Sequence, residues 1–83
     1  MNWTVGTPSN ITATTTFSNA KGLLGIFVSS ASATPTITIT DDTTTIVNTF
    51  TPAAATWYHI PVTISNSLVV TISGSVNCCV VWS

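Results

Sequence analysis

Three features of this 83-residue sequence predict an all-β fold, a single antiparallel β-sandwich of about seven to eight short strands. Apolar residues alternate with Thr and Ser along most of the chain, which is the period of a half-buried strand. The alternating runs are rich in Thr, Val, Ile and aromatic residues, which favour strands. Turn residues recur about every ten positions, a spacing typical of a jelly-roll or immunoglobulin-like sandwich.

The first half of the chain divides into an N-terminal arm, residues 1–10, and the start of a sandwich domain that spans residues 11–83. Alternation from Ile11 to Phe17 predicts the first strand, and the denser apolar run 23–29 predicts the second. Pro35 begins the third strand, at a position where proline is tolerated. Ile37 and Ile39 share the buried face of that strand, and threonines occupy its other face.

The second half contains four more predicted strands, at 44–50, 57–64, 68–73 and 76–82. Ile46 and Phe50 share one side of the first of these. The segments TPAAAT (51–56), SNS (65–67) and GS (74–75) connect them, because Pro, Asn, Ser and Gly are turn residues. No stretch follows a helical period.

The only two acidic residues, Asp41 and Asp42, stand side by side between two predicted strands. Asp is favoured in turns because its carboxylate accepts hydrogen bonds from nearby backbone amides and its backbone tolerates left-handed conformations. A calcium site takes six to eight oxygens, usually from several carboxylates. We therefore expect a hairpin tip here, with no metal and no cofactor.

Charge is nearly absent from the chain, which carries one Lys, two Asp, one His, eighteen Thr and ten Ser. One Lys without any Arg cannot neutralise a row of phosphates, so nucleic-acid binding is excluded, and anionic membrane surfaces lack a basic cluster to attract. A net charge near zero gives little colloidal repulsion and favours association. The composition predicts a protein that works inside an assembly.

The N-terminal segment MNWTVGTPSN lacks the basic and apolar regions of a signal peptide. The apolar runs GLLGIFV and CCVVW are too short to span a bilayer as helices. We expect the chain to be made and assembled in a cytoplasm.

Catalysis is not expected. Ser, His and Asp are present, but no G-x-S-x-G elbow accompanies them and no oxyanion hole is indicated. A small sandwich of hydroxyl-rich strands also offers little concave surface.

The strand at 57–64 is the most informative segment for function. Its even-numbered residues form an apolar face that predicts core, while Trp57, His59 and Pro61 lie on the opposite face. Proline inside a strand indicates an edge or a bulge. Two interpretations stay open: this outer face is covered within the chain, or it is a subunit interface, where aromatic residues are enriched.

The last strand is apolar on both faces. Val76, Cys78, Val80 and Trp82 alternate on one face, and Cys79 and Val81 on the other, which suggests cover by another copy. Adjacent cysteines point to opposite faces, so we expect two buried, reduced thiols. With Trp3 from the arm as a further anchor, the candidate interface comprises Trp3, Trp57, His59, Pro61, Cys79, Val81 and Trp82.

Two other binding surfaces are compatible with the sequence. The row Thr36, Thr38 and Thr40 raises ice binding, although without stacked repeats we expect the threonine array to be one strand wide. Trp57, Tyr58 and His59 offer an aromatic platform for a carbohydrate.

The segments AKGLLGIFVSSASATPTITITDD, TIVNTFTP, TWYHIPV and SLVVTISGSVNCCVVW, taken in order, resemble small β-sandwich structural proteins of tailed bacteriophages. Those proteins pass through a T-x-T-I-x-D hairpin and close with an L-x-V-T-I-S-G turn before a final strand with an aromatic end. The resemblance covers roughly residues 20 to 82. The Cys78–Cys79 pair departs from the polar alternation usual in that final strand.

Such proteins are often cement or decoration proteins, and the resemblance implies that role here. It implies a homotrimer on the outside of an icosahedral capsid, with the major capsid protein as partner and no catalytic residues. Whether the final strand lies at the same interface is left open by the cysteine pair. Another virion component, such as a tail, fibre or head–tail protein, is an alternative of the same build.

Overall fold

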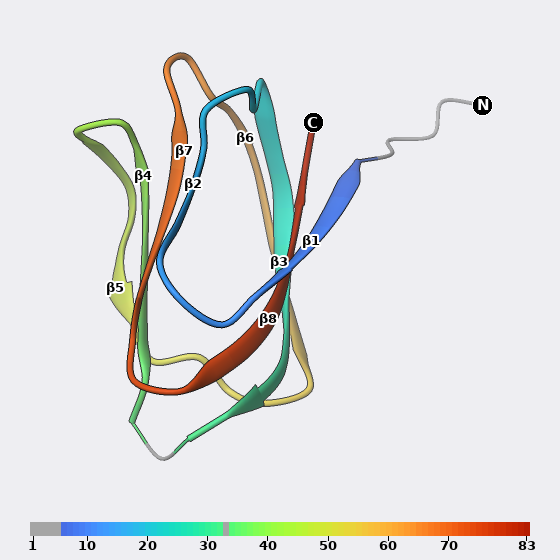
Figure 1. The fold of residues 1–83 in the computed structure, drawn as a ribbon, viewed down its shortest axis with the longest axis vertical. Coiled ribbons are helices and arrows are strands. Elements are labelled where there is room, and N and C mark those ends of the chain that lie inside the picture. The colour runs from blue at the N-terminus through green and yellow to red at the C-terminus, as the bar shows by residue number, and fades with distance from the viewer. Residues whose placement is uncertain (1–5, 33) are drawn as a thin grey trace.

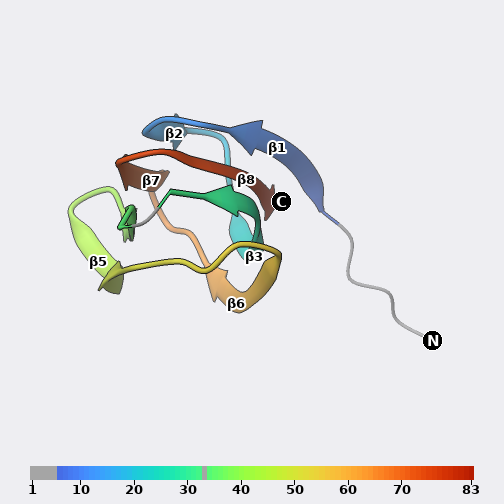
Figure 2. The ribbon, with the colours of Figure 1, turned by 90° about the horizontal axis from the view of Figure 1, so that it is seen from below.

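The computed structural model describes residues 6–32 and 34–83. These residues form eight strands in two sheets of four, with every pairing antiparallel and no helix among them. Figures 1 and 2 show the two sheets as two facing layers. The predicted all-β antiparallel sandwich is therefore confirmed. The described part of the chain offers no helix of the length and apolarity that crossing a membrane requires.

Each sheet draws its strands from both halves of the chain. One sheet has the order β1-β8-β3-β6 and the other β2-β7-β4-β5. The strands are β1 Thr7–Ile11, β2 Thr15–Phe17, β3 Gly22–Ala31, β4 Thr36–Asp41, β5 Thr44–Phe50, β6 Thr56–Thr63, β7 Leu68–Ser73 and β8 Val76–Trp82.

The predicted strand from Ile11 to Phe17 is two strands in two different sheets. Ile11 ends β1, which pairs with β8, whereas Phe17 ends β2, which pairs with β7. Residues 12–14 carry the chain from one layer to the other, as Figures 1 and 2 show. Strands that switch sheets form the corners of a sandwich, and an alternating pattern continues unbroken through such a corner.

The sheet also begins earlier than expected. Residues 7–10, which the sequence predicts as part of the N-terminal arm, belong to β1 and pair with β8 from Trp82 to Cys79. This strand could not be recognised in the sequence, because Pro8 and the polar residues around it lack the apolar alternation typical of a strand. Proline is tolerated here because β1 is the edge of its sheet.

The core lies between the two sheets and is made of inward-facing aliphatic side chains. Ile37 and Ile39 are fully buried, as their alternation with threonine predicted. Burying one such side chain contributes about 1.5–3 kcal/mol. The buried set is Ala20, Leu23, Ile26, Val28, Ile37, Ile39, Ile64, Leu68, Val70, Val76, Cys78 and Val80.

Asp41 and Asp42 lie at the tip of the β4–β5 hairpin, which confirms the predicted turn. Asp41 pairs with Thr44, and Asp42 has a left-handed backbone with a φ of 55°. Asp adopts this conformation more readily than most residues. The outer strand β5 then shifts register twice against β4, which is one way that a sheet edge is protected from pairing with other chains.

Candidate interaction surface

Strand β6 forms one edge of the β1-β8-β3-β6 sheet and alternates strictly between half-buried and exposed residues. Trp57, His59 and Pro61 are exposed on its outer side, while Tyr58 and Ile60 turn towards the core. The predicted edge strand with an outward Trp and His is confirmed. The interface role of these residues stays a prediction.

Strand pairing aligns the outward residues of β6 with those of its neighbours. One row across the sheet runs Asn10, Cys79, Phe27 and Trp57, and the next runs Pro8, Val81, Gly25 and His59. Paired residues share a face of the sheet. We call this outer surface the apolar face, formed by Pro8, Leu24, Phe27, Trp57, Pro61, Cys79 and Val81 together with Asn10 and His59.

Two large apolar side chains are exposed side by side on the apolar face. Phe27 is 40 % exposed and Trp57 is 44 % exposed, and their backbones pair across β3 and β6. Phe27 was not among the predicted site residues. The alternation of Ile26 and Val28 on the inner side could have found it, because the residue between them must then point outwards.

Gly25 provides the space into which the Trp57 side chain folds. A Cβ atom at position 25 would lie 2.5 Å from Cζ2 and Cη2 of the indole and 2.5 Å from the carbonyl oxygen of Tyr58. Only glycine fits beneath the ring at this separation. The Trp57 and His59 rings lie 6.3 Å apart, at an interplanar angle of 44°.

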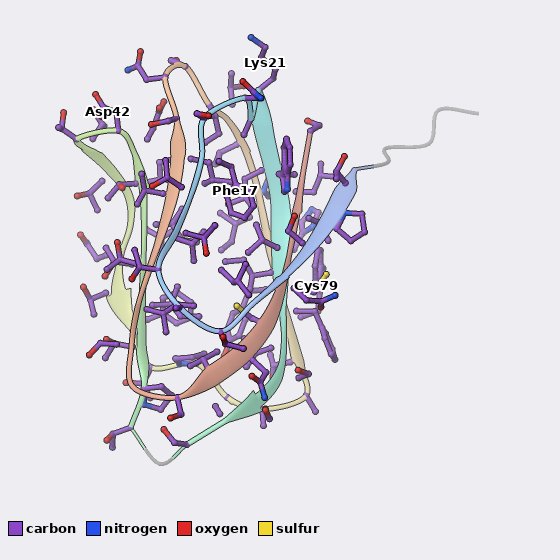
Figure 3. All side chains as sticks on the ribbon, viewed as in Figure 1. Phe17, Lys21, Asp42 and Cys79 are labelled. Carbon is purple, nitrogen blue, oxygen red and sulfur yellow. The ribbon has the colours of Figure 1, made fainter. Side chains whose placement is uncertain are left out.

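The two cysteines lie on opposite sides of β8, as predicted. Cys78 is buried in the core, and burial raises the pKa of its thiol to about 11, with a further rise from the neighbouring Cys79. Cys79 is only half-buried, on the outer side of the sheet as Figure 3 shows, so the expectation of two buried thiols holds for Cys78 alone.

Trp82 does not join Cys79 and Val81 on the apolar face. Its ring lies 5.4 Å from the ring of Phe17, a residue that points between the sheets in Figure 3, and its Nε1–H donates to Ser9 Oγ at 3.1 Å. Its inward direction follows from the parity that it shares with Cys78 and Val80. Trp3 lies outside the described residues.

Tyr58 is turned away from its neighbours in the proposed carbohydrate platform. Its hydroxyl accepts a hydrogen bond from the backbone N–H of Ala53 at 2.8 Å, and its ring lies 5.2 Å from that of Phe50. The Tyr58 side chain thus secures the β5–β6 connection. Trp57, Tyr58 and His59 do not form one surface.

The outer surface of the other sheet is lined with hydroxyls and extends across several strands. Thr38 pairs with Thr71 of β7, its Oγ1 lies 2.6 Å from Oγ1 of Thr49, and Thr40 pairs with Thr45 of β5. The expectation of an array one strand wide is therefore wrong. We call this surface the threonine face, formed by Thr16, Thr36, Thr38, Thr40, Thr45, Thr49, Thr71 and Ser73 around the half-buried Val69, which pairs with Thr16 and Thr40.

Asp41 acts as a structural clip. Its carboxylate accepts hydrogen bonds from the backbone N–H groups of Ser65 at 2.8 Å, Asn66 at 2.9 Å and Ser67 at 3.2 Å. The bonds from Ser65 and Asn66 hold the pKa of Asp41 below its ordinary value. Within residues 6–32 and 34–83, no three His, Cys, Asp or Glu side chains are grouped closely enough to hold a metal ion.

A surface depression of about 340 Å³ lies where the end of β6 meets the start of β3. Its described lining contains one amine and two hydroxyls but no carboxylate or imidazole, and His59 is not part of it. The lining residues are Lys21, Gly22, Leu23, Leu24, Pro61, Val62, Thr63 and Ser83.

No protein family matches this chain, and a comparison with curated proteins finds no relative. The resemblance to phage cement proteins therefore stays a prediction.

Proposed function

We propose that this chain is a non-enzymatic structural protein of a bacteriophage virion, a capsid cement or decoration protein. It binds the outer surface of an icosahedral head as a homotrimer, after assembly in the host cytoplasm. Its partners are other copies of itself and the major capsid protein. Its action is to stabilise the contacts between neighbouring capsomers.

One observation carries the proposal, namely the apolar face of the β1-β8-β3-β6 sheet. Phe27 and Trp57 are exposed there, Cys79 and Val81 lie between the sheet edges, and no Lys, Arg, Asp or Glu is among the described residues of that face. Aromatic enrichment and charge depletion are the composition of a protein interface core. The resemblance of residues 20 to 82 to phage structural proteins supports the same function.

The mechanism is adhesion. Each 100 Å² of apolar surface buried against the shell contributes about 2.5 kcal/mol at 25 cal/mol per Å². A trimer engages several sites at once, so each further contact forms at a high effective concentration. Many copies around the head raise the free energy required to separate the capsomers.

The test uses capsids from which the protein has been stripped. Adding the purified chain in excess is expected to raise the temperature at which these capsids disrupt, followed by light scattering. Phe27→Glu places a charge on the apolar face and is expected to abolish the effect, whereas Thr71→Glu on the threonine face retains it. An unchanged disruption temperature at high excess of the wild-type chain contradicts the proposal.

Two alternatives are separated by other measurements. A tail, fibre or head–tail protein shares this chemistry but differs in location, so imaging of the labelled chain in virions distinguishes it from a head protein.

A carbohydrate-binding sandwich has less support, because Tyr58 faces inwards and leaves Trp57 and Phe27 as the exposed rings. A glycan array without hits removes that alternative.

A further inference from the structure

The threonine face of the β2-β7-β4-β5 sheet takes no part in the proposed function. We infer that this face binds ice, as a regular array of hydroxyl and methyl groups that meets repeating oxygen positions on an ice surface. It lies on the opposite side of the sandwich from the apolar face, so ice binding does not depend on the cement function.

The side chains at the centre of the threonine face stand on a two-dimensional grid. Strands β4 and β7 pair over their whole length without a register shift. Neighbouring strands lie about 4.8 Å apart, and successive outward residues of one strand about 6.8 Å apart. Ice surfaces expose oxygen atoms at a comparable pair of repeats, so several hydroxyls can meet lattice positions at once. The outward pairs of the grid are Thr36–Ser73, Thr38–Thr71 and Thr40–Val69.

The array extends beyond these two strands. Thr45 of β5 pairs with Thr40, and Thr16 of β2 pairs with Val69, so one row crosses all four strands. Val69 is the one member of this row without a hydroxyl. Valine and threonine both branch at Cβ, so Val69 keeps the contour of the row.

The hydroxyls are held in position before any ligand arrives. Side chains that branch at Cβ have a restricted χ1 angle, and Oγ1 of Thr38 lies 2.6 Å from Oγ1 of Thr49, within hydrogen-bond distance. Long charged side chains would lose more rotamer freedom on binding. The face contains none, because its members are threonine, serine and valine alone.

The composition of the threonine face fits a repeating ligand better than a small molecule or a protein. A small molecule is held in a concave site by a few different polar groups, and the surface depression lies elsewhere, where β6 meets β3. A protein interface core is enriched in aromatic residues, Met and Arg, and none of these belongs to the face. Ice offers the same hydrogen-bonding group at every lattice position, as the face does.

The first experiment follows the growth of ice grains in a frozen sucrose solution held just below its melting temperature. We expect the wild-type chain to inhibit this recrystallisation. Thr71→Glu places a charge in the middle of the grid and is expected to raise the concentration that halves grain growth about tenfold, which corresponds to about 1.4 kcal/mol. Phe27→Glu makes the same change on the apolar face and should inhibit as the wild type does. If Thr71→Glu does not fold, Ser73→Glu repeats the test.

The second experiment measures binding directly with a dye attached to Cys79, on the opposite sheet. Cys78 is buried with a raised pKa, so a thiol reagent at neutral pH labels Cys79 in the folded chain. We expect slowly growing ice to incorporate the labelled wild-type chain and to exclude labelled Thr71→Glu into the liquid.

The outcomes separate ice binding from the proposed function. Grain sizes equal to those in an inert protein at the same concentration overturn the inference, as does equal inhibition by the wild type and Thr71→Glu. Loss of inhibition in a folded Phe27→Glu also overturns it, because the apolar face then carries the activity. A chain that binds ice without any effect on stripped capsids supports the inference and contradicts the cement function.

Discussion

At the scale of single residues, Gly25 determines where Trp57 lies. A methyl group at position 25 would stand 2.5 Å from both the indole and the backbone oxygen of Tyr58, and the backbone contact cannot be relieved by rotating a side chain. Overpacking of this kind costs about 1–3 kcal/mol. We therefore expect Gly25→Ala to lower the free energy of unfolding by about 1–3 kcal/mol, measured as a lower midpoint of urea unfolding.

The control for this prediction is Gly22→Ala in the same strand. A Cβ at Gly22 would meet Ser83 Oγ at 3.2 Å and the carbonyl oxygen of Val62 at 3.3 Å, so a small shift accommodates it. Equal unfolding midpoints for the two variants would contradict the conclusion that the space at Gly25 is required by Trp57 and the Tyr58 backbone. Because a backbone oxygen is involved, adding Trp57→Ala is expected to restore only part of the stability that Gly25→Ala loses.

At the scale of secondary-structure elements, the Asp41 clip joins the β4–β5 hairpin to the connection between β6 and β7. Three backbone N–H groups bind its carboxylate, and the backbone N–H of Asp42 donates to the carbonyl oxygen of Ser67 at 2.7 Å. That connection leads from one sheet to the other. The hydrogen bonds of Asp41 therefore fix the β6–β7 connection, through which the chain passes from one sheet to the other.

The clip predicts a stability that depends on acid. Because folding lowers the pKa of Asp41, its contribution is fully present above the unfolded-state pKa and is lost as the pH falls through the folded-state pKa. Asp41→Asn is expected to lower the melting temperature at neutral pH, and the difference from the wild type to shrink in acid. Thermal melts from neutral pH to strong acid measure this.

The matched control is Asp42→Asn. Asn tolerates the left-handed backbone of position 42 as well as Asp does, so this variant should melt as the wild type does at neutral pH. A difference between Asp41→Asn and the wild type that persists undiminished at low pH would show that the carboxylate charge is not what binds the turn.

At the scale of the whole molecule, stability rests on one small core between the sheets. The free energy of unfolding of a small domain is about 5–15 kcal/mol. Replacing a buried isoleucine with alanine lowers it by about 2–5 kcal/mol. Ile39 is fully buried at the centre of β4. Ile39→Ala is therefore expected to lose a large share of the total stability in urea unfolding.

The comparison is Thr71→Val on the exposed threonine face, which keeps a β-branched side chain. Surface substitutions of this kind change stability by about 0.5 kcal/mol or less. A comparable loss in Thr71→Val would mean that the threonine face is packed against something in solution. The denaturant slope should stay constant in both variants if the native fold is retained.

Much of the fold and part of the candidate surface could be predicted. Alternation assigned Ile37 and Ile39 to the core and Trp57 and His59 to an outer face, and Pro61 indicated that their strand is an edge, as the structure has them. Alternation also places Trp82 on the inner face with Cys78 and Val80, which is inconsistent with its inclusion in the predicted interface, and it places Phe27 on the outer face between Ile26 and Val28. The corner between Ile11 and Phe17 was not visible, because both sides of a corner alternate alike.

The sequence by itself determined most of the strands from Leu23 onwards and which side of each is apolar, because both follow from the local period of the backbone. Tertiary structure alone decided which strands are neighbours. It brings Cys79 beside Phe27, 52 positions away, and Thr14 into hydrogen-bond contact with Ile72, 58 positions away. It also places Trp57 over Gly25 and the turn amides on Asp41, since such contacts depend on register between distant segments.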